Sequence, residues 1–304
     1  MTKYLKALTL ALAAVAAAAA PVAAQDGGTL KKVKDTGSIT IGHRDASIPF
    51  SYYDDKQQPV GFAMDICSRI VDAVKTELKL PNLEVKYALV TSANRIPLMA
   101  NGTIDLECGS TTNNEERQKQ VGFTNSHFVT ASRYVTKKAN SIKSIDDLKG
   151  KTVVSTSGTT NIKQLNTVNT ERKLGMNILP ANGHSEAFLM VETDRAVAFV
   201  MDDILLASLA ASSKTPEAYQ ISSDAFSLPE PYGIMLRRDD KDFKRVVDAA
   251  TAALYKSGEI EKLYTKWFQS PIPPRGLNLN LAMPDGLAKA FKNPTDSGDP
   301  AAYQ

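Results

Sequence analysis

The sequence predicts an α/β protein of two lobes joined by a double-stranded hinge. Over residues 38–108, β-branched strand patterns alternate with amphipathic stretches, which is typical of a mostly parallel sheet with crossover helices. The same alternation restarts over 144–203 and predicts a second unit of similar construction. Two extended runs, near 127–131 and 229–235, predict the crossings between the units. We therefore expect the first lobe to be discontinuous in sequence.

Lobe 1 is expected to comprise residues 36–128 and 232–282. Its first strand, 38–42, is β-branched and alternating, and its first long helix repeats an apolar residue every fourth position over 66–78. Pro81 ends that helix. The elements expected here are a short leader helix before 37, strand 38–42, helix 65–80, strand 83–90, a short helix ending near 101, strand 103–108, a helix-like segment at 115–118, helices 243–256 and 259–268, and, beyond the lobe, a helix at 285–292 and a mobile tail within 283–304.

Lobe 2 is expected to comprise residues 129–231, within the usual size of a domain. A helix is predicted to begin at His184, and the apolar run 195–201 predicts a buried strand that leads into Asp202. The elements expected in this lobe are a short helix at 144–150, strand 151–155, a long helix opened by the polar residues 156–160, strand 176–180, the helix from 184 and strand 195–201.

The first residues predict a signal peptide over 1–24. Lys3 and Lys6 precede an apolar, alanine-rich run, and a small-x-small pattern predicts cleavage after Ala24. A retained membrane anchor is the alternative, but the run is shorter and richer in alanine than a comfortable span. We therefore expect a soluble, exported mature protein.

Charge argues against one class of partner. The chain has 36 Lys and Arg against 33 Asp and Glu, a formal net charge of +3. Nucleic-acid binding is dominated by neutralisation of phosphates, and no basic face large enough for it is predicted. We expect no nucleic-acid partner.

The two cysteines, Cys67 and Cys108, leave the question of a disulfide open. An oxidising compartment permits a bond between them. Two buried free thiols are an equal alternative, because the sequence does not show that the pair meets the geometry a disulfide requires.

The stretch from Asp105 to Arg117 has the composition of an anion-binding turn. A strand end is followed by glycine, hydroxyls, amides and an incoming arginine, which together suit a small carboxylate ligand. Taken alone, the stretch is better explained as an ordinary polar turn with a solvated arginine, and the rest of the sequence shifts that balance. Ligands of parallel sheets bind beyond the carboxyl ends of strands, and Arg44, Ser92 and Ser110 each follow a predicted strand. We expect these side chains to face one cleft.

Motifs in order along the chain resemble one family. They include Gly42-His-Arg44, Ser92-Ala-Asn-Arg95, Glu107-Cys-Gly-Ser110, Ser157-Gly-Thr-Thr160, Arg195-Ala-Val-Ala-Phe-Val-Met-Asp202 and Pro271-Ile-Pro-Pro274. Together they resemble the periplasmic glutamate/aspartate-binding proteins of ABC importers, within solute-binding protein family 3, from about residue 36 to 282. The resemblance implies the type II periplasmic binding protein fold, whose lobes close on an amino acid and deliver it to a membrane permease.

The resemblance also implies which residues hold the groups common to all amino acids. Arg117 would hold the α-carboxylate with its planar fork, assisted by backbone amides near Thr112 and Thr160. Asp202 would meet the α-ammonium, and the hydroxyls of Ser110 and Thr112 would act as neutral acceptors.

The side-chain pocket is inferred from departures from other members of the family. Arg44 stands where glutamine-binding relatives carry an Asp, and Ser92 stands where relatives often carry an aromatic residue. Arg95 replaces an aliphatic residue, and His184 opens a helix on the other lobe. Two guanidiniums, a hydroxyl and an imidazole suit a second carboxylate, because unpaired like charges are expensive once desolvated. We expect L-glutamate and L-aspartate as ligands.

Several of these residues have plainer alternatives. Arg95 is otherwise a surface arginine, and His184 is otherwise a helix-terminal residue without a ligand. Asp203 is expected to be a helix N-cap rather than the ammonium ligand. Phe50 is expected to pack rather than to contact the ligand.

An enzyme on the same scaffold, such as a cyclohexadienyl dehydratase, is the alternative from another class. An enzyme would need a poised acid or base, for which Glu107 and His184 are the candidates, and His184 is better explained as a donor to the ligand. The 3 histidines lack metal-ligand spacing, so no metal or cofactor is expected. A receptor ectodomain is a further alternative. We expect a freestanding, monomeric binding protein in the periplasm, and not an enzyme.

Overall fold

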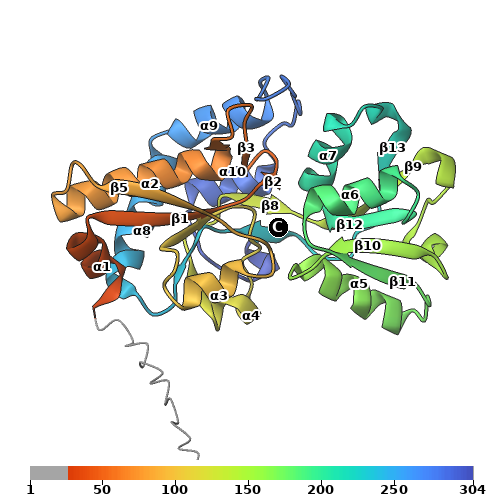
Figure 1. The fold of residues 1–304 in the computed structure, drawn as a ribbon, viewed down its shortest axis with the longest axis horizontal. Coiled ribbons are helices and arrows are strands. Elements are labelled where there is room, and N and C mark those ends of the chain that lie inside the picture. Colours follow the sequence, from red (N-terminus) through yellow and green to blue (C-terminus); the bar gives the residue numbers. More distant parts are fainter. Residues whose placement is uncertain (1–26, 304) are drawn as a thin grey trace, which may run out of the picture.

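The computed structural model describes residues 27–303 and shows two lobes connected by extended segments (Figure 1). Each lobe contains a five-stranded sheet, and a pair of short strands lies between them. The signal peptide predicted over 1–24, with its cleavage site at Ala24, lies outside the described residues. Within 27–303, none of the helices has both the length and the apolar character needed to cross a membrane.

The sheet of lobe 1 has the strand order β5-β1-β6-β15-β7. Strand β1 (Ser38–His43) runs parallel to β5 (Glu84–Leu89) and to β6 (Leu106–Cys108). Strand β15 (Met235–Arg237) returns from the distant part of the chain and pairs antiparallel with β6 and β7 (Val121–Phe123). The parallel strands β1 and β6 therefore end at the same edge, where residues 44 and 109–112 follow.

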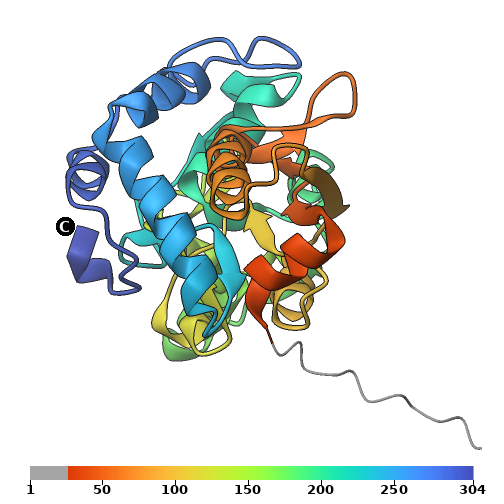
Figure 2. The same ribbon diagram turned by 90° about the vertical axis from the view of Figure 1, so that its left-hand side faces the viewer.

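The helices of lobe 1 pack their apolar stripes against this sheet and against one another. In α2 the buried residues recur along one face, and the helix packs beside α8. Figure 2 views this lobe from its outer end, with the C-terminal helices along the left edge. The helices are α1 (Gly28–Thr36), α2 (Phe62–Leu78), α3 (Arg95–Ala100), α4 (Glu115–Gln118), α8 (Lys241–Lys256), α9 (Glu259–Phe268) and α10 (Asp285–Lys292), and a small sheet is formed by β2 (Ala46–Ser47), β3 (Ser51–Tyr53) and β4 (Pro59–Val60).

The sheet of lobe 2 has the order β11-β10-β12-β9-β13. Strands β10 (Thr152–Thr156), β11 (Asn177–Ala181) and β12 (Ala198–Asp202) are parallel, whereas β9 (Ser132–Lys137) and β13 (Tyr219–Ile221) pair antiparallel. The remaining elements are α5 (Thr160–Glu171), α6 (His184–Glu192), α7 (Asp203–Ser212) and the 3-10 turns η1 (Lys138–Asn140), η2 (Ile145–Leu148) and η3 (Pro216–Ala218).

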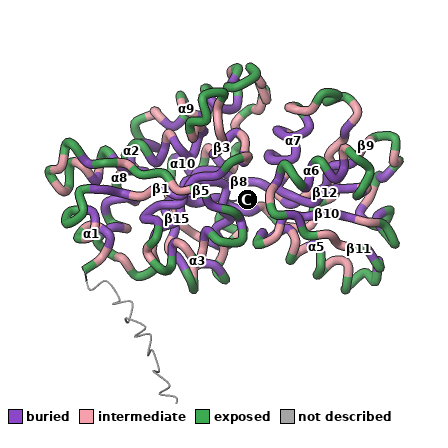
Figure 3. Tube along the Cα trace, in the orientation of Figure 1, coloured by how far each residue is buried: buried purple, intermediate pink, exposed green. Residues whose placement is uncertain are grey.

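Two short strands connect the lobes. Strand β8 (Phe128–Thr130) pairs antiparallel with β14 (Glu230–Tyr232), so that the outgoing and returning chains lie side by side. The proposed lobe boundaries, at 128/129 and 231/232, fall within these strands. Buried residues are concentrated in the sheets and in this connection (Figure 3).

An aromatic cluster anchors the connection to lobe 1. The ring of Phe50 is fully buried and lies edge-on to Phe128 of β8, with centroids 4.9 Å apart, and to Tyr232 of β14, at 5.2 Å. Phe128 also stacks on Phe268 of α9 at 5.2 Å. Phe50 thus packs at the base of the connection, as expected for a core residue.

The segment after α10 differs from the mobile tail that the sequence predicts. The hydroxyl of Tyr303, in the 3-10 turn η4 (Pro300–Tyr303), lies 2.7 Å from Ser126 Oγ, and the side chain is buried. Asn113 Nδ2 donates to the backbone oxygen of Asp296 at 2.8 Å. These partners are far away in sequence, so local composition did not reveal them.

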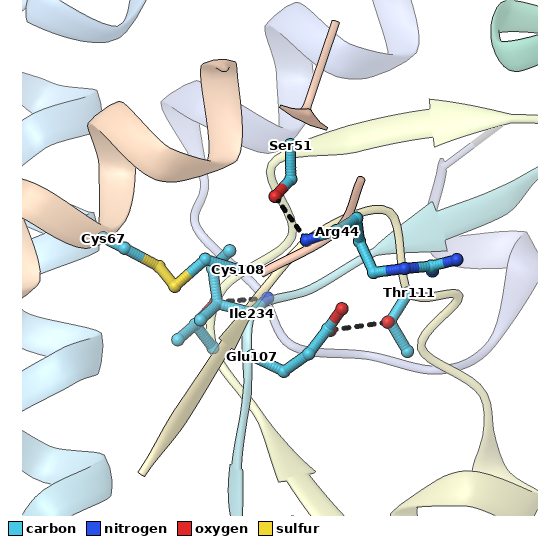
Figure 4. Close-up of a disulfide and its surroundings, with 8 residues drawn as sticks. Arg44, Ser51, Cys67, Glu107, Cys108, Thr111 and Ile234 are labelled. Carbon is cyan, nitrogen blue, oxygen red and sulfur yellow. Dashed lines mark hydrogen bonds between the residues drawn. A yellow bond between two sulfur atoms is a disulfide. The ribbon is translucent and has the colours of Figure 1, made fainter. Parts of the chain in front are cut away.

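A disulfide links Cys67 of α2 to Cys108 at the end of β6, with Cα atoms 6.3 Å apart (Figure 4). Of the two alternatives that the sequence leaves open, a disulfide and two free thiols, the structure contains the disulfide. The bond ties the longest helix of lobe 1 to the strand that leads into Ser110 and Thr112, which line the cavity between the lobes.

Candidate ligand-binding site

A cavity lies between the two lobes at the carboxyl ends of their parallel strands. Its free volume is about 10 Å³, so an amino acid enters only if the lobes or the lining side chains move. Seven of the nine predicted site residues line it, and the other two, Arg44 and Arg117, donate hydrogen bonds to lining residues. The lining residues are Ser92, Arg95, Ser110, Thr112, Thr159, Thr160, Asn161, His184, Met201, Asp202 and Leu205.

Arg44 follows β1 directly and is buried. Its backbone N–H donates to Ser51 Oγ at 2.9 Å, which fixes the turn, and its Nη2 donates to Ser92 Oγ at 3.0 Å. Its Nε and Nη1 have no hydrogen-bond partner among residues 27–303. Burial, together with the charge of Arg95, lowers the pKa of Arg44 to about 10. The side chain remains cationic at neutral pH and has two donors available for an anion.

Arg95 begins α3 and is buried, which excludes a surface position. Its Nη1 donates to Thr111 Oγ1 at 2.5 Å, and the hydroxyl of Thr111 donates to Glu107 Oε2 at 2.6 Å. Glu107 Oε1 lies 3.9 Å from Arg95 Nη1, within ion-pair distance. Burial lowers the pKa of Arg95, and the Glu107 carboxylate partly opposes that shift.

Arg117 spans the gap between the lobes. Asn114 caps α4 and accepts from the backbone N–H of Arg117 at 2.9 Å, which orients the short helix. The guanidinium donates through Nη1 to Thr112 O at 2.9 Å and through Nη2 to Gly158 O, on lobe 2, at 3.3 Å. Burial, together with the charge of Arg95, lowers the pKa of Arg117 to about 10.

Asp202 ends β12, and its carboxylate is held from two directions. Asn161 Nδ2 donates to Oδ1 at 2.8 Å, and the hydroxyl of Tyr232, in the connecting strand β14, donates to Oδ2. Burial raises the pKa of Asp202, and these two hydrogen bonds oppose the rise. A cation placed beside such a buried carboxylate stabilises its ionised form. Sequence reasoning missed Asn161 and Tyr232, although Asn161 directly follows the Ser157–Thr160 motif of the resemblance.

The expectation that Asp203 is the N-cap of its helix is wrong by one position. Asp202 occupies the cap position of α7, and Asp203 is the first helical residue. Asp203 Oδ1 accepts from Thr130 Oγ1 at 2.6 Å and from the backbone N–H of Ile204 at 2.7 Å. Because Asp202 turns its carboxylate toward Asn161, the neighbouring Asp203 accepts the hydrogen bond from a free backbone N–H at the start of the helix instead.

His184 begins α6 and is buried. Its Nδ1 lies 2.9 Å from Thr156 Oγ1, and its Nε2 has no partner within the described part of the chain. Burial, with the charges of Arg44 and Arg95, lowers the pKa of His184 well below 6.5. The ring is therefore neutral, and when Thr156 donates to Nδ1 the Nε2–H is free to donate to an anion.

The hydroxyl residues lie on both sides of the cavity. Ser110 Oγ is buried and unpaired with respect to residues 27–303. Thr112 Oγ1 on lobe 1 lies 3.4 Å from Thr160 Oγ1 on lobe 2. Thr159 caps α5 by accepting from Ile162 N at 3.2 Å, so the positive end of this helix faces the cavity.

The site carries a formal excess of positive charge. The guanidiniums of Arg44, Arg95 and Arg117 face the carboxylates of Glu107 and Asp202, which gives 3 − 2 = +1. Across the described residues, no group of three or more His, Cys, Asp or Glu side chains is arranged to hold a metal ion.

Two α/β lobes, a two-stranded connection and a polar cavity between them define a bilobal solute-binding protein. The chain belongs to the bacterial extracellular solute-binding proteins, family 3, whose model matches residues 39–270.

Relatives with assigned names support this membership. The chain is 52% identical over 290 residues to an L-glutamate/L-aspartate-binding protein of Pseudomonas aeruginosa, covering 95% of this chain and 96% of the relative. It is 48% identical over 289 residues to a glutamate/aspartate import solute-binding protein of Escherichia coli, covering 95% of each. A solved mutant of ArgBP from T. maritima is 28% identical, with a TM-score of 0.69 over 79% of this chain and 99% of that one. These findings confirm the resemblance and the type II fold predicted from the sequence, and the named relatives are binding proteins rather than enzymes.

Proposed function

We propose that the protein captures L-glutamate and L-aspartate between its lobes and delivers them, chemically unchanged, to the permease of an ABC importer. The observation that carries the substrate class is the convergence of three buried guanidiniums, Arg44, Arg95 and Arg117, on one cavity that also contains Asp202. Relatives at 52% and 48% identity that are named for the same two amino acids support this assignment.

The groups common to all amino acids are assigned to one end of the cavity. Arg117 binds the α-carboxylate, because its fork matches two carboxylate oxygens and it already bridges Thr112 and the start of α5. The backbone amides near Thr112 and Thr160 assist it. Asp202 binds the α-ammonium. The hydroxyls of Ser110 and Thr112 also accept hydrogen bonds from this ammonium as neutral acceptors.

The distal carboxylate is assigned to the arginine-rich end. Arg44 offers Nε and Nη1, Ser92 is held by Arg44 Nη2, and His184 offers Nε2. Arg95 supplies the second guanidinium. Glu107 balances only one of the two guanidinium charges, so a neutral amide in this place would leave one desolvated positive charge without a counter-charge, which disfavours glutamine.

Lobe closure is assigned to the paired strands β8 and β14. Lobe 1 comprises residues 36–128 and 232–282, and lobe 2 comprises residues 129–231. The C-terminal segment after 282 packs on lobe 1 as an addition to it. The cavity of about 10 Å³ between the lobes is too small for an amino acid, which supports entry by separation of the lobes. The ligand then stabilises the closed form because Arg117 and Arg44 belong to one lobe and Asp202 to the other.

Export completes the proposal. The leader is removed near Ala24, and the mature protein acts as a monomer in the periplasm. The family's description as extracellular binding proteins favours a location outside the cytoplasmic membrane. Nucleic acid is not a partner.

A thermal-shift panel of the twenty amino acids tests the proposal. L-Glutamate and L-aspartate are expected to raise the midpoint of unfolding, since a ligand that binds the folded state stabilises it. Stabilisation by glutamine or arginine with no response to either acid would contradict the substrate class. Recovery of a converted ligand would favour the dehydratase-like enzyme instead.

A further inference from the structure

A buried carboxylate, Glu107, lies behind the arginine-rich end of the cavity and has no role in the ligand contacts above. It belongs to β6 and is fully buried. Figure 4 shows its side chain pointing toward Thr111, on the opposite side of the strand from the Cys108 disulfide. This alternation is the ordinary geometry of a strand, and it places an acid on the face of β6 that supports the cavity.

Glu107 lies close to Arg95 and to Arg44, the two arginines assigned to the distal carboxylate. It is connected to Arg95 through the hydroxyl of Thr111, by bonds of 2.5 and 2.6 Å, and directly at 3.9 Å. A Cβ atom built on Gly109 would overlap Glu107 Oε1 and lie 3.1 Å from Arg44 Cγ. Glycine at 109 therefore leaves room for the carboxylate and the stem of Arg44 to lie on either side of the backbone.

We propose that Glu107 is a positioning residue that sets the charge of the distal subsite and makes it select a side chain with a single negative charge. Arg44 and Arg95 contribute two positive charges and Glu107 removes one, which leaves 2 − 1 = +1. The carboxylate of a glutamate or aspartate side chain balances this charge. The inference rests on the proposed function, since it concerns the subsite assigned there to the distal carboxylate.

Charge balance matters here because the groups are desolvated. A second negative charge on the ligand would have no matching cation and would face Glu107 in a medium that screens poorly. A neutral side chain would leave one positive charge unmatched. If Glu107 merely held Arg95 in place through Thr111, its removal would instead weaken the binding of every acidic ligand by the same factor. Setting the charge and holding Arg95 therefore predict different changes in the ratio of affinities between ligands of different charge.

Two glutamate analogues with tetrahedral end groups separate these roles. L-Homocysteate ends in a sulfonate with one negative charge, and L-2-amino-4-phosphonobutanoate ends in a phosphonate that is a dianion at mildly alkaline pH. Their chains have the same length as that of L-glutamate. Calorimetry at that pH gives the dissociation constants of both for the wild-type protein, for Glu107→Gln and for the charge-conserving Glu107→Asp.

The wild-type protein is expected to prefer the sulfonate. In Glu107→Gln the ratio of the two affinities shifts toward the phosphonate by about tenfold or more, and in Glu107→Asp it stays near the wild-type value. Glu84→Gln, an exposed carboxylate on β5, removes the same charge away from the site and leaves the ratio unchanged. Thermal unfolding of each variant reports its folding.

Equal weakening of both analogues in Glu107→Gln, with an unchanged ratio, would overturn the proposal. If that variant does not fold, equal binding of the two analogues by the wild-type protein overturns it, and a preference for the sulfonate supports it. If neither end group is accepted, the affinity ratio of L-glutamate to L-glutamine should rise in Glu107→Gln, and a constant ratio contradicts the proposal. Failure of the wild-type protein to bind L-glutamate would refute the proposed function itself, so the two failures remain distinct.

Discussion

Arg117 Nη2, on lobe 1, lies 3.3 Å from the backbone oxygen of Gly158, on lobe 2. The residue assigned to the α-carboxylate therefore also joins the lobes. Gly158 has φ +77°, and a Cβ atom there would lie 2.5 Å from the backbone of Ala93 across the cleft. The lobes meet in this arrangement only because residue 158 has no side chain.

Gly158→Ala is expected to weaken binding of L-glutamate by about tenfold or more, because the added methyl group holds the lobes apart while the ligand-binding side chains remain. Calorimetry measures the affinity. Gly175→Ala is the matched control, because Gly175 also has positive φ, at +58°, but an added Cβ there would meet no described residue within 4 Å other than its chain neighbours. Both variants should lose about 1–2 kcal/mol of stability through backbone strain, and only Gly158→Ala should lose affinity. Equal affinities in the two would contradict closure at this contact.

Arg44→Ala should weaken acidic ligands by about 2–5 kcal/mol, the range for truncating one partner of a buried charge pair. The residue is fully buried, and its Nε and Nη1 lack partners among the residues that the structure places. Calorimetry with L-glutamate measures the loss. Arg172→Ala is the control, since Arg172 is exposed on lobe 2, where it pairs with Asp146 at 3.5 Å. Unchanged affinity in Arg44→Ala would remove Arg44 from the site.

Reduction of the disulfide should lower the free energy of unfolding. The bond closes a segment with a sequence separation of 41, for which loop-closure entropy corresponds to about 4 kcal/mol. Urea unfolding with and without reductant measures the difference, and the double variant Cys67→Ser with Cys108→Ser should reproduce it. Identical unfolding curves in both conditions would show that the bond is absent or without effect.

Stability should depend on pH through Glu230 of the connecting strand. Burial, with the nearby Asp202 carboxylate, raises the pKa of Glu230 from 4.5 to about 8. The folded protein therefore holds this proton more tightly than the unfolded chain does. The associated stability is complete below the unfolded pKa of 4.5 and is lost as the pH rises to about 8.

Urea unfolding across this pH window checks the effect. Glu230→Gln should reduce the decline in unfolding free energy, because a permanently neutral amide replaces the titrating group. Glu217→Gln, an exposed carboxylate of η3, should follow the wild-type curve. A decline of equal size in Glu230→Gln and the wild-type protein would exclude Glu230 as its source.

The elements that the sequence predicts well are those set by local pattern. The starts of α6 at His184 and of α9 and α10, at 259 and 285, agree with the structure because caps and apolar periodicity are short-range signals. The packed tail and the disulfide were not decided by the sequence. Both depend on which distant segments meet, as when Tyr303 reaches Ser126.

The site shows the same division. Arg44, Ser92 and Ser110 could be placed because they lie shortly after strands whose ends meet at one edge of a sheet. The link from Arg95 through Thr111 to Glu107 could not, because it depends on which face of β6 points to the cavity and on side-chain conformation. The clamp on Asp202 by Asn161 and Tyr232 also joins separate segments and has no local signature.

A calorimetric titration of the mature protein with L-glutamate, paired with one using L-glutamine, tests the central claim most directly. The convergence of Arg44, Arg95 and Arg117 on the cavity predicts saturable one-to-one binding of L-glutamate and at least about a hundredfold weaker binding of L-glutamine. Binding of L-glutamine as tight as or tighter than that of L-glutamate would contradict it.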